Sequence, residues 1–203
     1  MMAFWRASAP LVLASESRTR QILLANASIP FEPIAAAIDE RATEAELAAS
    51  GAGASEIAVQ LSIAKAQKVS GILPSRLVIG ADQVLCLEGR LLAKAADPAM
   101  VRFQLELFSG KTHELHSGCC AVRDGKVLFE TVSVARLSLR KLSAEFIEAY
   151  LAQAGGCPGS GSYKIEGLGI QLFEAIDGDH FTILGLPLLP LLSFLRKEGS
   201  LLS

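Results

Sequence analysis

Charged residues that could bind phosphate follow an apolar run near the start of the chain. Residues 15–20 (SESRTR) come directly after the apolar residues 11–14 and lead into helix-forming sequence. Backbone N–H groups at a helix start are unpaired and the dipole is positive, so arginines there are unfavourable unless an anion lies nearby. This pattern suits a phosphate group. An equally open interpretation is that Ser17 only caps the helix while the arginines face solvent.

A lysine and an aspartate further along could belong to the same chemistry. Lys65 falls inside the apolar arc of an expected helix over residues 55–69, where it either extends from the edge of the core into water or offers a charge to phosphate. Asp82 is the first charged residue after the apolar run 77–81, so it could bind Mg²⁺ or Mn²⁺, accept a proton from water, or merely start a turn.

Glu40 and Lys94 add a second carboxylate and another cation, although neither is specific alone. Phosphoryl transfer needs such a set, because cations neutralise charge while a carboxylate orients the attacking water.

The elements that must position these residues alternate between strand and helix. We expect strands at 11–14, 30–38, 77–81, 112–122, 127–139 and 170–176, and helices that begin near residues 20, 43, 55, 98, 143 and 187. Thr43 has capping-box spacing, Ser55 could cap the next helix, and Asp97-Pro98 is a typical helix start. A hairpin turn is expected at Glu88-Gly89, and a glycine-dense loop at 155–169.

This order predicts an α/β or α+β fold with one long mixed sheet flanked by helices, because helix-linked strands tend to run parallel while hairpins add antiparallel pairs. Ligands of such sheets bind beyond the carboxyl ends of strands, where residues 15–20 and Asp82 are expected.

Composition limits the class of protein. With 203 residues, 51% hydrophobic and 20% charged, the chain suits a single domain over residues 1–203, with a bilobed form left open. A net charge of −2 excludes a broadly basic surface, so no nucleic-acid partner is expected, and no apolar run is long enough to cross a membrane. Four cysteines without a CxxC pair favour reduced thiols and a cytoplasmic location. His113 and His116 are three apart in an expected strand, which favours structural histidines over a metal pair.

Taken in order, several segments resemble the Maf family. They are LASES (13–17) with Arg20, IDE (38–40), AKA (64–66), GADQV (80–84), Lys94, SGKTH (109–113), GSYKIEGLG (161–169) and GLPL (185–188). No single segment is diagnostic, but their shared order from about residue 11 to 196 makes a coincidental match improbable.

The resemblance implies a fold similar to that of inosine triphosphatases, with a nucleotide in a central cleft. It also implies a nucleotide pyrophosphatase that hydrolyses a nucleoside triphosphate to the monophosphate and pyrophosphate, and it suggests a homodimer. By resemblance, Asp82 is the proton acceptor, Glu40 and Asp82 hold a divalent cation (Mg²⁺, Mn²⁺ or Co²⁺), and the substrate phosphates are bound by Ser15, Ser17, Arg20, Lys65 and Lys94.

Three positions resemble the family's substrate selectors: Thr19, Gln83 and Glu166. Gln83 and Glu166 resemble the branch that acts on 7-methyl-GTP, since a carboxylate can accept the guanine N–H donors and oppose the charge of the methylated ring. Thr19 departs from that branch, which has an aromatic residue there. The alternatives are a dTTP or UTP pyrophosphatase of the same family, a regulatory binding protein linked to inhibition of septum formation, and a nucleotide-binding member without turnover.

Overall fold

The computed structural model describes residues 4–154 and 162–203, so the first part of the glycine-dense loop, residues 155–161, lies outside the described residues. The chain divides into two compact units. The first contains Met1–Val84, His116–Val134 and Asp179–Ser203, and the second contains Leu85–Leu115 and Ala135–Gly178. The single domain expected over the whole chain remains a prediction. No helix within the described residues is long and apolar enough to cross a membrane.

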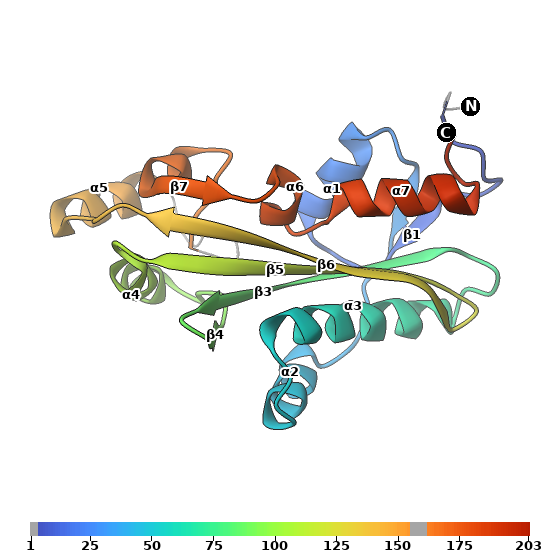
Figure 1. Ribbon diagram of the computed structural model, residues 1–203, viewed down its shortest axis with the longest axis horizontal. Coiled ribbons are helices and arrows are strands. Elements are labelled where there is room, and N and C mark those ends of the chain that lie inside the picture. Colours follow the sequence, from blue (N-terminus) through green and yellow to red (C-terminus); the bar gives the residue numbers. More distant parts are fainter. Residues whose placement is uncertain (1–3, 155–161) are drawn as a thin grey trace. The chain divides into compact units, whose positions relative to one another are not determined.

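The first unit is built on parallel strands linked by helices. Strand β1 (Leu11–Leu13) pairs in parallel with both β2 (Phe31–Pro33) and β3 (Val78–Leu87). The chain enters β2 through α1 (Arg18–Asn26), and it enters β3 through α2 (Glu40–Ala49) and α3 (Ala54–Ser70) (Figure 1). These crossover helices allow the strands to run parallel.

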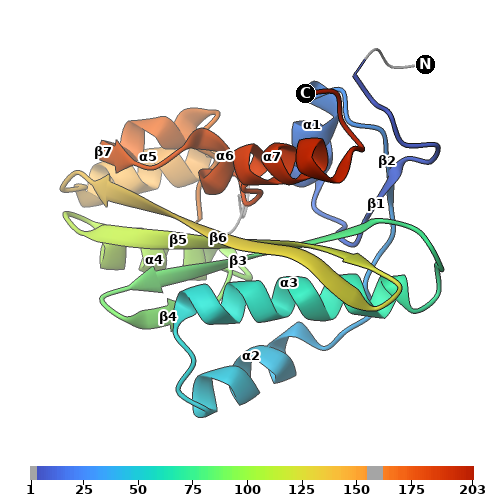
Figure 2. The ribbon, with the colours of Figure 1, turned by 45° about the vertical axis from the view of Figure 1, so that its right-hand side comes forward.

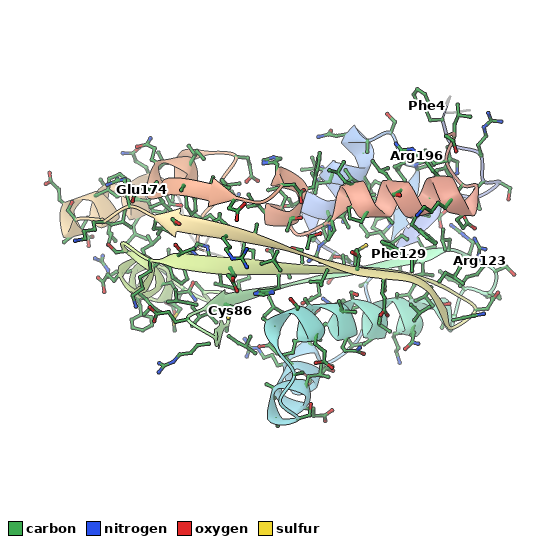
Figure 3. All side chains as sticks on the ribbon, in the orientation of Figure 1. Phe4, Cys86, Arg123, Phe129, Glu174 and Arg196 are labelled. Atoms are coloured by element: carbon green, nitrogen blue, oxygen red, sulfur yellow. The ribbon has the colours of Figure 1, made fainter. Side chains whose placement is uncertain are left out.

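Successive side chains of β1 pack in two different core clusters, one on each face of the sheet. Leu11 and Leu13 belong to a core cluster with α1 and with α7 (Leu188–Glu198), whereas Val12 packs in a second cluster with residues of α3. Successive side chains of a strand point to opposite faces, which explains the division. Figure 2 shows α1 and α7 on one side of these strands and α3 on the other. On the α7 side, Phe129 of β6 (Lys126–Leu139), which is labelled in Figure 3, stacks on Phe194 with ring centroids 4.9 Å apart.

Two glycines let α3 lie directly against the sheet. A Cβ at Gly80 of β3 would be 2.0 Å from the Ser62 carbonyl oxygen, and a Cβ at Gly118 of β5 (Thr112–Arg123) would be 2.3 Å from that of Ala58. Only glycine avoids these clashes, because it has no Cβ. The close approach brings Lys65, on the same helix, to the level of Asp82.

The second unit contains the β3–β4 hairpin, in which Leu87 pairs with Arg90 of β4 (Arg90–Leu92), together with α4 (Pro98–Phe108) and α5 (Ala144–Ala154). A 3₁₀ helix, η1 (Leu168–Leu172), leads into β7 (Phe173–Asp177), which pairs antiparallel with the end of β6. His113 lies in the core of this unit, stacked on Phe108 with centroids 4.8 Å apart, and its Nε2 is 2.6 Å from the Tyr163 hydroxyl.

The described strands form one sheet in the order β2-β1-β3-β5-β6-β7, with β4 paired to β3. Both parallel and antiparallel pairs occur in it, which confirms the predicted mixed sheet flanked by helices. The predicted turn at Glu88-Gly89 is also confirmed, as is the helix start at Asp97-Pro98, where the Asp97 carboxylate accepts the Met100 N–H at 2.8 Å.

Three predicted strand boundaries were wrong. The strand expected at 170–176 is Phe173–Asp177, because residues Leu168–Leu172 form the 3₁₀ helix η1. The strand expected at 30–38 is only Phe31–Pro33, because its partner β1 ends at Leu13, opposite Pro33. Asp82 does not mark the end of a strand, since β3 continues to Leu87. Beyond Ile79 the strand loses β1 as a neighbour, but pairing with β5 and β4 keeps it extended.

Two predicted helix caps were also wrong. Helix α2 begins at Glu40 because the Asp39 carboxylate accepts the Ala42 N–H at 3.0 Å, so Thr43 lies inside the helix. Helix α3 has Gly53 at its N-cap, and the Ser55 hydroxyl instead lies 2.8 Å from Nδ1 of His116. The short helix α6 (His180–Ile183), capped by Asp179, was not expected from the sequence.

Candidate active site

Arg20 is held at the end of β1 by three other chain segments. Its Nε donates to the Gly185 carbonyl at 2.7 Å, and its Nη1 donates to the Ala81 carbonyl at 2.8 Å and to Ser15 Oγ at 3.1 Å. None of the hydrogen bonds between described residues uses Nη2, which is also absent from the fully buried unpaired atoms of those residues. Because a guanidinium carries five N–H groups, two donors remain available to an anion.

Both interpretations of the segment 15–20 therefore hold in part. Ser17 caps α1, since its hydroxyl accepts the Arg20 backbone N–H at 3.4 Å. Arg20 is nevertheless buried, whereas Arg18 is exposed. Burial lowers the pKa of the Arg20 guanidinium, while the charge of Asp82 acts in the opposite direction. Arginine stays protonated in proteins, so the site contains a fixed and largely desolvated cation.

Lys65 bridges two carboxylates. Its Nζ lies 2.5 Å from Oδ1 of Asp82 and 2.9 Å from Oε1 of Glu40. The Lys65 side chain is only 7% exposed and that of Asp82 10%, whereas that of Glu40 is 54% exposed. A buried ammonium is costly unless it is paired, and here two carboxylates pair with it. The ammonium group thus does not extend into water, which was one of the two interpretations open from the sequence.

Glu44 is a third carboxylate close enough to feel the charges of Asp82 and Glu40. Partial burial raises the pKa of Glu44, and the charges of Asp82 and Glu40 raise it further. Glu44 follows Glu40 by one turn of α2, so residues on one face of that helix approach Asp82. The arrangement combines three carboxylates with the cations Arg20 and Lys65.

The carboxylates leave oxygen atoms for a metal ion. Ion pairs between described residues use Oε1 of Glu40 and Oδ1 of Asp82, and the second oxygen of each is not engaged in them. Oxygen donors of this kind suit Mg²⁺ or Mn²⁺ rather than softer metals. The donor set thus fits the expected divalent cation.

Gln83 lies next to Arg20 and is half-buried. Its Nε2 donates toward Ser117 Oγ at 3.0 Å and toward the carbonyls of Thr182 and Ile183 at 3.1 and 3.0 Å. Gly185, with φ of +86°, separates the two side chains: a Cβ there would be 3.4 Å from Arg20 Nη2 and 3.6 Å from Gln83 Cδ. These are ordinary van der Waals distances, so the positive φ rather than a lack of space is what favours glycine at this position.

The other expected site residues fall into two groups. Thr19 is half-buried at the start of α1, in the first unit with Arg20. Lys94 and Glu166 are exposed and belong to the second unit, so their expected roles in phosphate binding and base selection remain predictions.

Sequence reasoning missed Glu44, Ser117 and Gly185. Glu44 had a usable signal, because it lies four residues after Glu40 in a helical segment. Gly185 was part of a resembling motif without an assigned role. Ser117 had no local signal, since its partners Gln83 and Thr182 are 34 and 65 residues away in the sequence.

Comparisons with known proteins find similar sequences over nearly the whole chain. Residues 10–198 match the family model described as "Maf-like protein". A nucleoside triphosphate pyrophosphatase of Nitrobacter winogradskyi is 56% identical over 97% of this chain and 98% of that protein. A 7-methyl-GTP pyrophosphatase of Brucella suis biovar 1 is 52% identical over 93% of this chain and 96% of that protein.

The solved structure of a HAM1 protein from Coxiella burnetii aligns with 75% of this chain and 78% of that protein, with a TM-score of 0.42 and 17% sequence identity. This structural similarity is too low to support a conclusion about this chain. The family model and the high sequence identity over nearly the whole chain are sufficient to assign the family. They confirm the resemblance found in the motifs. The chain belongs to the Maf family.

Proposed function

We propose that this chain hydrolyses a nucleoside triphosphate to the monophosphate and pyrophosphate, with Asp82 as the proton acceptor. The observation that carries the proposal is the buried Asp82 carboxylate, held 2.5 Å from the Lys65 ammonium and followed directly by Gln83. The names of the relatives support the same reaction, since seven of those most similar are nucleoside triphosphate pyrophosphatases.

Each cation has a distinct task in this proposal. Arg20 offers the two N–H groups of Nη2 to the phosphates, and Lys65 holds Asp82 in place while adding positive charge. Ser15 and Ser17 support this end of the site: Ser15 accepts from Arg20, and Ser17 caps the helix. One water adds across the anhydride between the α- and β-phosphates, its proton passes to Asp82, and pyrophosphate leaves.

A divalent cation completes the charge balance. A triphosphate brings several negative charges to a site where three carboxylates already outnumber Arg20 and Lys65. Glu40 and Asp82 would hold Mg²⁺, Mn²⁺ or Co²⁺, which when bound neutralises developing charge on the phosphates. We include this metal in the proposal because the oxygen donors suit it.

For the substrate we propose 7-methyl-GTP. The residues Gln83 and Glu166 support it, as does the name of the Brucella relative. Thr19 gives no aromatic face to a cationic base, so pyrimidine nucleotides remain the competing substrates. The cytoplasmic location, the homodimer and the absence of a nucleic-acid partner remain predictions.

The test is release of pyrophosphate from 7-methyl-GTP, GTP, dTTP, UTP and CTP with Mg²⁺ or Mn²⁺. Wild type is compared with Asp82→Asn, which keeps the shape of the side chain, and with Asp177→Asn as a matched control at a position 82% exposed. We expect cleavage of 7-methyl-GTP to be fastest, abolished by Asp82→Asn and unchanged by Asp177→Asn. Preference for pyrimidines would refute the substrate, and binding without turnover on any nucleotide would refute the reaction and favour a binding protein.

A further inference from the structure

A buried glutamine on α4 connects two segments of the second unit. Gln104 is only 3% exposed. Its Nε2 donates to the Ala93 carbonyl at 2.7 Å, and its Oε1 accepts from the Ser162 hydroxyl at 2.5 Å. A carbonyl oxygen can only accept, so the amide nitrogen must face Ala93 and the amide oxygen must face Ser162. Both ends of the amide are therefore used, and its direction is fixed.

The segment bound by the amide nitrogen carries Lys94. Residues 93–96 lie between the end of β4 and the start of α4, and Lys94 is exposed. Of the hydrogen bonds between described residues, only the one from Gln104 reaches residues 93–96. The position of the Lys94 backbone thus depends on a buried side chain of the following helix.

The segment bound by the amide oxygen is the part of the glycine-dense loop that begins at Ser162. This serine is fully buried and has a φ of +62°, a left-handed conformation that is unfavourable for a residue with a Cβ. Such a conformation persists only where surrounding contacts hold it. Here the hydroxyl bonds Gln104, the Ser162 carbonyl accepts from the Tyr150 hydroxyl at 3.5 Å, and the next residue, Tyr163, bonds His113. The loop is thus held firmly at this point and gives Gln104 a fixed support.

We propose that Gln104 is a positioning residue, which connects the segment of Lys94 to the start of this loop and so holds the Lys94 ammonium ready for the phosphates of the nucleotide. The inference rests on the proposed function and on the phosphate role expected for Lys94. Lysine is a compact charge on a flexible stem, so its reach depends on where its backbone lies. Without Gln104, the segment must be ordered when the nucleotide binds, and that cost weakens binding.

The test separates KM from kcat for the nucleotide that the substrate panel shows to be preferred. Gln104→Met has a similar volume but loses both bonds, so KM should rise about tenfold, as for one charge-assisted hydrogen bond, while kcat changes less than about twofold. Gln153 is exposed on α5, so Gln153→Met is the matched control and should follow wild type. An unchanged KM in Gln104→Met overturns the proposal, because the residue then has only a structural role.

A double substitution decides whether the effect passes through Lys94. Lys94→Met should raise KM by itself. Adding Gln104→Met to it should change KM less than about twofold, because the cation to be positioned is already gone. If the two effects multiply instead, the residues act independently and the proposal fails.

Ser162→Ala is a milder variant that leaves the bond between Gln104 and Ala93 in place. It removes the hydroxyl that supports the amide, so KM should rise by about threefold in an otherwise wild-type chain. It should have no further effect in Gln104→Met, because both substitutions remove the same hydrogen bond. A KM that does not change in Ser162→Ala would show that the loop gives no support, which also overturns the proposal.

Equilibrium binding separates this inference from the reaction. Calorimetry with the same nucleotides compares Asp82→Asn with Asp82→Asn/Gln104→Met, so no turnover is needed. A wild type that releases no pyrophosphate refutes the proposed function, while a roughly tenfold weaker affinity of the double variant still supports the role of Gln104. Equal affinities overturn that role, and the absence of nucleotide binding overturns both proposals.

Discussion

His113 should make the stability of the protein depend on pH. Burial lowers the pKa of its imidazole from 6.5 to about 4. The ring is fully enclosed, stacked on Phe108 and bonded to Tyr163, and its Nδ1 has no partner within the described part of the chain. The folded protein therefore keeps His113 neutral under conditions in which the unfolded chain protonates it.

The direction follows from proton linkage. Below pH 6.5 the unfolded state binds a proton that the folded state does not, so the free energy of unfolding falls as the pH falls from 6.5 to about 4. Above pH 6.5 the contribution is fully present. Between pH 7.5 and pH 5.0, a pKa depressed this far corresponds to a loss of about 2 kcal/mol.

The assay is urea denaturation followed by circular dichroism at pH 7.5, 6.5 and 5.0. His113→Gln retains a polar group toward Tyr163 but has no ionisable ring, so its stability should fall by about 2 kcal/mol less than that of wild type over this range. Its stability at pH 7.5 is expected to be lower because the stack is lost. His180→Gln, at an exposed position, is the matched control and should follow wild type. A His113→Gln variant with the full wild-type pH dependence would refute the reasoning.

Three other substitutions test how the fold builds the site. Gly80→Ala should destabilise the protein by about 3 kcal/mol in denaturation, since its Cβ would lie 2.0 Å from a backbone oxygen of α3, whereas Gly71→Ala, whose Cβ would make only ordinary contacts at 3.6 Å, should be nearly neutral. Arg20→Lys keeps the charge but loses the bonds to two carbonyls, so kcat/KM should fall at least about tenfold, while Arg18→Lys should have no effect. Thr19→Trp should raise kcat/KM for 7-methyl-GTP relative to GTP by about tenfold through a cation–π contact, and an unchanged ratio would place this residue away from the base.

Local patterns in the sequence were sufficient for much of the fold. The β1–α1 turn, the helix start at Asp97-Pro98 and the turn at Glu88-Gly89 follow from short-range signals, and the structure confirms them. Strand ends were less predictable, because they depend on the length of the partner strand. The strand expected at 30–38 ends at Pro33, which pairs with the last residue of the three-residue strand β1.

The role of Lys65 was equally hard to predict from its own segment of the sequence. A helical wheel placed Lys65 in an apolar arc, but it could not say whether the ammonium reached water. The answer depends on Asp82, 17 residues away, which approaches the helix only because Gly80 lets α3 lie close to β3. A buried lysine is stable only when such a partner exists, so its role was not contained in its own segment.

Arg20 shows why the two interpretations of its segment were never true alternatives. Ser17 caps α1, and that cap fixes the helix start from which Arg20 extends. Three N–H groups of the guanidinium then bind backbone or side-chain oxygens of Ser15 after β1, of Ala81 within β3 and of Gly185 after α6, which holds Nη2 in one direction. A cation fixed in this way needs little rearrangement when a phosphate arrives, and such preorganisation is the main source of electrostatic catalysis. The same bonds that stabilise the fold therefore prepare the site for its substrate.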